Sequence, residues 1–191
     1  MKHSLFTFFL TFTFLYASSQ INAKPDSLNV YQRLDVSYTF GGQVYNDNFT
    51  YNPGIAVFCV TGLMPNDNIG LGFVYGFHSM QNERFIPLGA EVIGYKSGNK
   101  GNSFIRMQAG YSIGWYQGET SLVGHNYSGG LFVDAGIGRK IYLADDLSVM
   151  FTLSYRHQFA KTEYEIFGKQ TFTETLNFDM LVISLSLLRN N

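Results

Sequence analysis

The pattern of hydrophobic and polar positions is clearest over residues 104–116, FIRMQAGYSIGWY. Every second side chain in this stretch is apolar, at Ile105, Met107, Ala109, Tyr111, Ile113 and Trp115. The side chains between them are mostly small or polar, among them Arg106, Gln108, Gly110, Ser112 and Gly114. Strict alternation predicts a β-strand, because successive side chains point to opposite faces. Repeated glycine beside one charge suits a crowded interior, so the pattern predicts a transmembrane barrel strand with its apolar face outward.

The same alternation recurs along the chain and predicts how many strands the barrel has. Apolar side chains are expected to face outward over 34–40, 69–77, 88–92, 131–137 and 149–155. Residues 54–61 make a further strand whose phase the pattern leaves open. Residues 176–187 make the last strand, in which a change of phase near 180–183 predicts a β-bulge. The prediction is an all-β protein, a single antiparallel up-and-down transmembrane β-barrel of about eight strands, an even number as bacterial barrels require.

The connections between these strands differ in length. Turns rich in Pro, Asn, Asp and Gly are predicted over 64–68, 97–101 and 144–146. Long polar loops are predicted over 43–52, 117–127 and 161–173. Outer-membrane barrels have short periplasmic turns and longer outer loops. The pattern therefore places both termini in the periplasm.

The first residues predict a secreted protein. A short basic start over 1–3 precedes an apolar run over 5–16, and small residues suited to signal-peptidase cleavage follow. We expect a signal peptide over 1–19, with an alternative cleavage site after residue 23, and an outer-membrane β-barrel domain over 24–191. No later apolar run reaches the length of about 18 residues that a membrane-spanning helix needs.

Composition argues against several classes of function. The 191 residues carry a formal net charge of -1 with 14% charged residues, which gives no support for the basic surface of a nucleic-acid-binding protein. The only cysteine, Cys59, has no partner for an internal disulfide. The histidines and this cysteine lack the spacing of metal ligands, and no glycine motif lies between a strand and a helix. We expect no metal and no cofactor.

The charges on the predicted inward face are the most informative set. They are Arg33, Asp35, Glu91, Arg106, Asp134 and Arg156, with Asp179 as a possible further member. An eight-stranded barrel is only wide enough for its own side chains, and isolated buried charge is costly. We therefore expect an interior ionic network that fills the lumen, and no general pore. The predicted hairpins bring Asp134 opposite Ser154 or Arg156, and Glu91 opposite Arg106 or Gln108.

Aromatic residues make up 17% of the chain, and one of them marks a membrane boundary. Trp115 lies near the end of the strand over 104–116, on its outward face, just before the polar loop that begins at residue 117. The indole ring is apolar while its N–H needs a polar partner, which suits the level where membrane meets water. We therefore predict that Trp115 lies at that interface.

Three stretches resemble a known family: residues 85–91 (FIPLGAE), 108–114 (QAGYSIG) and 183–187 (ISLSL). They are similar to the small eight-stranded outer-membrane barrels of the OmpA/OmpX-like superfamily, and most similar to the outer membrane protein beta-barrel domain family common in Bacteroidetes. The resemblance implies the outer membrane of a Gram-negative bacterium, with outer-membrane lipid, lipopolysaccharide and the outer-membrane assembly machinery as partners. It also implies a structural or surface-interaction role, and leaves the partner of the extracellular loops open.

Two other classes of function stay open. An outer-membrane enzyme acting on lipid or surface substrates would need a site at the barrel rim, for which the candidates are His78, His125 and His157 with Ser79, Glu83, Glu163 and Glu165. The His-any-Ser pair of lipid A deacylase barrels is missing at each histidine, so we do not expect an enzyme. A secreted soluble β-barrel that binds a small apolar ligand would instead need the apolar faces turned inward.

Overall fold

The computed structural model describes residues 29–45, 48–66, 68–96, 102–120, 123–166 and 170–190. The strands are β1 (Asn29–Tyr45), β2 (Asn48–Tyr51), β3 (Gly54–Asn66), β4 (Ile69–Ser79), β5 (Glu83–Lys96), β6 (Asn102–Tyr116), β7 (Val123–Tyr142), β8 (Leu147–Ile166) and β9 (Gln170–Asn190). Within these ranges, no helix is both long enough and apolar enough to cross a membrane. The predicted signal peptide over 1–19 and the predicted turn over 97–101 lie outside the described residues.

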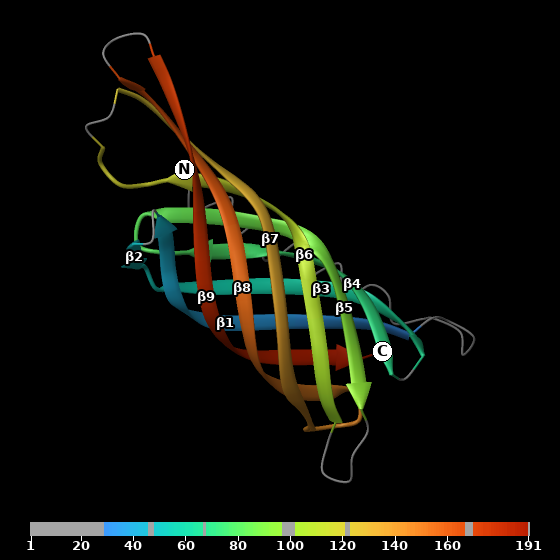
Figure 1. Ribbon diagram of the computed structural model, residues 1–191. Helices are drawn as coiled ribbons and strands as arrows, with labels where there is room; N and C mark the ends of the chain where they lie inside the picture. The colour runs from blue at the N-terminus through green and yellow to red at the C-terminus, as the bar shows by residue number, and fades with distance from the viewer. Residues whose placement is uncertain are drawn as a thin grey trace, which may run out of the picture.

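Antiparallel pairing closes the strands into a barrel (Figure 1). β1 pairs with β3 on one side and with β9 on the other, while β2 folds back onto the end of β1. Eight strands therefore form the closed wall, which confirms the predicted fold class. We call the end of the barrel where β1 begins and β9 ends the terminal rim, and the opposite end the loop rim.

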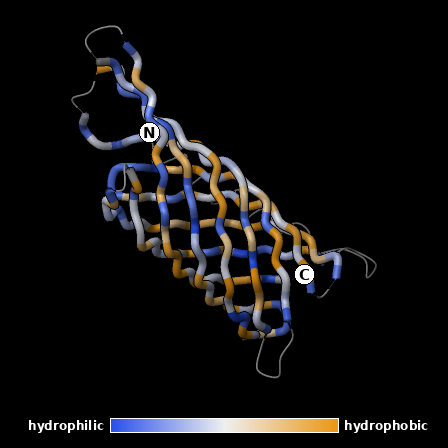
Figure 2. Tube along the Cα trace, in the orientation of Figure 1, coloured by the Kyte–Doolittle hydropathy of each residue, from blue (hydrophilic) through white to orange (hydrophobic). Residues whose placement is uncertain are grey.

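Hydropathy alternates along the strands of the wall (Figure 2). Successive side chains point to the outside and to the lumen in turn, as the sequence predicts. On β6, Ile105 and Met107 are 65% and 61% exposed, whereas Arg106 between them is 2% exposed. The strand whose phase the sequence left open is β3, where Ala56 and Phe58 face the lumen. Apolar residues stand on both faces of β3, which explains why its alternation in the sequence is weak.

The predicted bulge near residues 180–183 is wrong. β9 pairs with both β8 and β1 in one register along its length, without a shift. Its lumen face changes from apolar side chains, such as Phe178 and Met180, to hydroxyls, such as Ser184 and Ser186. The apparent change of phase is therefore a change in the chemistry of the lumen. Register shifts occur elsewhere, twice between β7 and β8 and once between β3 and β4.

Much of the sequence expected as long loops forms strands instead. β7, β8 and β9 have 20, 20 and 21 residues, against 11 in β4. Their pairing with the rest of the wall ends at Tyr111–Leu131 and Val44–Asn177. Beyond those pairs they rise past the loop rim as a three-stranded sheet (Figure 1), which we call the extension and define as residues 123–128, 161–166 and 170–176.

The predicted loop over 43–52 is likewise partly strand, since β1 runs to Tyr45 and β2 pairs with its end. Both this hairpin and the extension carry polar residues on both faces, so they lack the alternation that marks a wall strand. Their Thr, Tyr and Phe residues nevertheless favour extended backbone. The turn predicted over 144–146 is present, because the backbone N–H of Ala144 donates to the Leu147 carbonyl at 3.0 Å.

Candidate functional site

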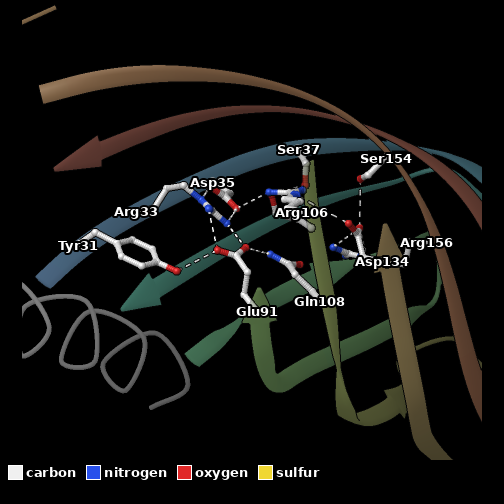
Figure 3. A network of polar contacts seen from close by, with 11 residues as sticks. Tyr31, Arg33, Asp35, Ser37, Glu91, Arg106, Gln108, Asp134, Ser154 and Arg156 are labelled. Carbon is white, nitrogen blue, oxygen red and sulfur yellow. Dashed lines mark hydrogen bonds and ion pairs between the residues drawn. The ribbon is translucent and has the colours of Figure 1, made fainter. Parts of the chain in front are cut away.

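A belt of buried charge crosses the middle of the lumen (Figure 3). β1 contributes two members and β5, β6, β7 and β8 one each: Arg33, Asp35, Glu91, Arg106, Asp134 and Arg156. None of the six is more than 2% exposed. They point inward because each occupies the face of its strand opposite the apolar one. We call these six residues the ionic layer.

One half of the ionic layer is centred on Arg33 and Glu91. The Arg33 guanidinium donates to Asp35 Oδ1 from Nε at 2.7 Å and to Glu91 Oε1 from Nη1 at 2.9 Å. Its Nη2 also donates to the second oxygen of Glu91. Gln108 Nε2 donates to Glu91 Oε2 at 2.7 Å, and the Tyr31 hydroxyl donates to Oε1 at 3.2 Å. Glu91 is therefore satisfied by partners from two other strands, β1 and β6.

The other half is centred on Asp134. Arg156 donates to Asp134 Oδ2 from Nε at 3.1 Å, and its Nη2 lies 3.0 Å from the same oxygen. Ser154 Oγ donates to that oxygen at 3.2 Å. Arg106 joins the halves, with Nη1 at 3.0 Å from Asp35 Oδ2 and Nε at 3.8 Å from Asp134 Oδ1. Negative and positive side chains alternate through the layer, so its formal net charge is zero. The order is Glu91, Arg33, Asp35, Arg106, Asp134 and Arg156.

The structure brings all six predicted charges together, and the pairs follow the hairpins in part. Asp134 lies directly opposite Arg156, and Glu91 directly opposite Gln108. Arg106 was one candidate partner of Glu91, but it reaches across the lumen to β1 instead. β6 and β1 are not neighbours in the sheet, so no hairpin register could indicate this contact.

Asp179 is not a member of the ionic layer, contrary to expectation. It lies on the outward face of β9 near the loop rim, opposite His157 on β8. His157 Nδ1 is 2.6 Å from Asp179 Oδ1, and the Tyr155 hydroxyl donates to the same oxygen. The side chains of His157 and Asp179 are 27% and 34% exposed. The wrong assignment followed from the supposed bulge, which shifted the inferred phase of this half of the strand.

Apolar clusters fill the lumen on both sides of the ionic layer. Towards the terminal rim they include Tyr31, Phe58, Ile93, Tyr95, Phe104, Met150 and Leu188. Towards the loop rim they include Met80, Phe85, Tyr127, Leu176, Phe178, Met180 and Val182. The Arg156 guanidinium lies 4.5 Å from the centre of the Phe58 ring, so charge and apolar cluster are in direct contact. Side chains thus occupy the lumen along its length.

Inward glycines make room for the aromatic rings of these clusters. A Cβ on Gly62 would lie 2.5 Å from the Tyr31 ring, and one on Gly138 would lie 2.3 Å from the Phe104 ring. Both distances are too short for real contacts, so any larger residue would displace a ring. The sequence indicated a crowded interior from its glycines, and the structure identifies what crowds it.

The loop rim is held by polar contacts. Asn52 Nδ2 donates to Glu83 Oε2 at 2.7 Å, and the Gln81 backbone N–H donates to Asn52 Oδ1 at 3.0 Å. These bonds join the end of the β1–β2 hairpin to the connection between β4 and β5. His78, considered from the sequence as a rim residue, is 1% exposed inside the lumen, with Nε2 at 3.2 Å from Thr39 Oγ1. It is therefore out of reach of an external substrate.

Two further predicted residues lie at the loop rim. Trp115 faces outward, is 38% exposed, and its ring centre is 6.1 Å from that of Phe77. His125 belongs to the extension, where its Nε2 is 3.0 Å from Thr162 Oγ1. Among the described residues, no three His, Cys, Asp or Glu side chains gather where they could hold a metal ion.

Comparisons with known proteins identify the fold. No protein-family model matches the chain, and no curated protein matches it. The crystal structure of Neisserial surface protein A (NspA) matches with a TM-score of 0.58 and 10% identity, covering 84% of this chain and 96% of that one. The outer membrane protein OprG from Pseudomonas aeruginosa matches with a TM-score of 0.60 and 8% identity, covering 86% and 96%. The fold is thus that of small outer-membrane β-barrels.

Proposed function

We propose that this chain is an integral outer-membrane protein of a Gram-negative bacterium, with a sealed barrel and a structural or surface-interaction role. Within the superfamily, its sequence stretches favour the Bacteroidetes-type barrels. The observation that carries the proposal is the buried ionic layer with an apolar cluster on each side of it. It argues against a general pore, and it leaves the outer surface and the extension as the parts that meet other molecules.

The outer surface supports insertion in a membrane. Outward side chains along the wall are large and apolar, for example Ile105 at 65%, Leu131 at 60% and Phe151 at 53% exposed. A soluble protein rarely exposes a contiguous apolar surface of this kind. In a bilayer the same side chains face lipid, while the closed sheet leaves no unpaired edge in the hydrocarbon region.

The extension supports an interaction role outside the cell. It carries three glutamates, Glu163, Glu165 and Glu174, against Lys161 as its only Lys or Arg among the described residues. It is ordered by its own contacts: the Tyr164 hydroxyl donates to Glu174 Oε1 at 2.8 Å, and the Tyr164 and Phe172 rings stack at 6.3 Å. In the proposed orientation, with both termini periplasmic, this sheet projects from the cell surface. A partner with basic groups fits its charge.

Cell fractionation and epitope accessibility test the proposal together. We expect the protein in the outer-membrane fraction, released only by detergent. An epitope inserted after Glu119 at the loop rim should be labelled on intact cells, and one inserted after Asp145 at the terminal rim should need permeabilised cells. Recovery as a soluble periplasmic protein would refute membrane insertion, and the reverse labelling pattern would refute the orientation.

An enzyme at the loop rim is the second candidate function, favoured by the pair of His157 and Asp179. A carboxylate on Nδ1 leaves Nε2 of the ring free to accept a proton, which is the arrangement of a general base. The pair lies where the apolar wall meets the polar extension, so a lipid ester is the substrate class to test. Release of fatty acid by the wild-type protein but not by His157→Ala would favour this function, and no release by the wild-type protein would eliminate it for the esters tested.

A further inference from the structure

A groove crosses the outward face of the barrel near the terminal rim. It has a volume of about 980 Å³, and the outward side chains that line it include Ile105, Ile137, Phe151, Leu153 and Ile183. A second groove of about 410 Å³ shares three of these residues and continues over Ala135 towards the loop rim. The two together form one furrow, whose walls are apolar.

Gly94 widens the furrow at its end near the terminal rim, because it has no side chain. It occupies an outward position of β5 next to Ile105 of β6. A Cβ placed on Gly94 would meet no atom closer than 3.6 Å, at Ile105 Cγ1. Inward glycines such as Gly62 and Gly138 leave room for a ring of the same chain, whereas the space above Gly94 is open.

Two cations and a hydroxyl stand together at this end of the furrow. Lys96 pairs with Ser103, and Ser103 pairs with Arg139, so the three lie side by side on β5, β6 and β7. All three are exposed and line the groove. Neighbouring strands are about 4.8 Å apart, so the backbones of Lys96 and Arg139 lie roughly 10 Å apart on either side of Ser103. Their long side chains can therefore reach one anion.

The surrounding charge favours an anion here. The described carboxylates of the terminal rim are Asp145 and Asp146, both on the turn beyond the furrow, and Arg189 Nε lies 3.5 Å from Asp146. Among the described residues that line the furrow, Lys96 and Arg139 are present and no carboxylate is. Guanidinium and ammonium groups with a hydroxyl between them match the oxygens of a phosphate.

We propose that this furrow binds one diacyl phospholipid of the periplasmic leaflet, with its phosphate held by Lys96, Ser103 and Arg139 and an acyl chain along the apolar walls. Arg139 lies four positions after Ala135 in β7, about 13 Å along an extended chain. Half of a hydrocarbon core is about 15 Å, so the furrow suits a chain of one leaflet. The choice of a phospholipid over lipopolysaccharide rests on the orientation in the proposed function, which puts the terminal rim in the periplasm.

Native mass spectrometry of the full-length mature protein in detergent micelles tests the proposal. The probes are a phosphatidylglycerol, the diacylglycerol with the same two chains, and purified lipid A. The variants are Lys96→Gln combined with Arg139→Gln, which removes the phosphate ligands, and Gly94→Phe, which fills the furrow without removing charge. Lys161→Gln removes one cation at the opposite end and is the matched control. Heat-modifiable gel mobility checks that each variant is folded.

We expect one phosphatidylglycerol to stay bound to the wild-type protein and to Lys161→Gln. Its affinity should fall at least tenfold in the double variant and in Gly94→Phe. Equal retention in all folded variants, or equal retention of the diacylglycerol, would overturn the proposal, because either means unspecific lipid contact. Preference for lipid A would overturn the choice of phospholipid. Failure of the wild-type protein to fold in micelles would count against the proposed membrane function itself, and the inference would fall with it.

Discussion

The pair of Asp134 and Arg156 gives the sharpest test of the ionic layer. Arg156→Ala removes both nitrogen contacts to Asp134 Oδ2, at 3.0 and 3.1 Å. It leaves this carboxylate, which is 0% exposed, with Ser154 and with Arg106 Nε at 3.8 Å. Removing one partner of a buried ion pair costs about 3–5 kcal/mol, because the other charge is left without compensation. We expect a loss of unfolding free energy in that range.

The single variant Asp134→Ala and the double variant of Asp134 and Arg156 complete a double-mutant cycle. Asp134→Ala leaves the Arg156 guanidinium over the Phe58 ring, at 4.5 Å, without its carboxylate. We expect a loss of similar size. With both residues replaced, neither charge is left buried alone, so the combined loss should be smaller than the sum of the single losses by about 0.5–3 kcal/mol.

Urea unfolding of the protein in lipid vesicles measures these losses, with the fluorescence of Trp115 as the signal. Thr152→Val is the matched control. Thr152 is another inward residue of β8, and its hydroxyl has no hydrogen-bond partner among the described residues. Replacing it by an isosteric apolar residue should change stability by less than about 1 kcal/mol. If Arg156→Ala is as mild as the control, or if the two single losses simply add, the pair does not stabilise the barrel.

Three further predictions concern the lumen, the interface and the extension. In planar bilayers, the purified protein should form no stable channel that lets sugar-sized solutes through, because Phe58 and Phe85 belong to the clusters that fill the lumen on either side of the ionic layer. A stable sugar-permeable channel would falsify the sealed lumen. Fluorescence of Trp115 should be quenched most by lipids labelled near the headgroup, and strongest quenching at the bilayer centre would contradict its placement. A hydrogen bond from Lys161 lowers the pKa of Glu163, so the carboxylate should protonate at higher pH in Lys161→Gln, and an unchanged NMR titration would show that the pair is not formed.

Alternation in the sequence was enough to predict the wall of the barrel. Neighbouring residues such as Ile105 and Arg106 reveal their faces without any knowledge of the rest of the fold, because strand geometry has a period of two. The same information places the members of the ionic layer inside and indicates the contact of Asp134 with Arg156, since hairpin partners are also close in sequence. It carries no information about strands that meet only across the lumen.

The features that sequence reasoning missed therefore have three physical causes. Arg106 reaches Asp35 from β6 to β1, and that distance depends on how the closed wall curves and tilts. The extension was taken for loops because polar residues occur on both of its faces, so its sequence lacks the alternation of a wall strand. The false bulge in β9 arose because Phe178 and Met180 are apolar although they face the lumen, where the loop-side cluster needs them.

The neutral, alternating layer of charge also bears on how the barrel closes. A slip of β1 by one residue against both of its neighbours, β3 and β9, would turn its outward apolar side chains inward. A slip of two residues would restore the pattern of faces, so hydrophobicity cannot detect it. Such a slip would carry Arg33 and Asp35 about 6.6 Å along the wall, away from Glu91 on β5 and Arg106 on β6. Misaligned closure would then seal unpaired charges in a dry interior. We therefore expect the ionic layer to disfavour a two-residue slip of β1 when the barrel closes, an error that the pattern of lipid-facing side chains alone would tolerate.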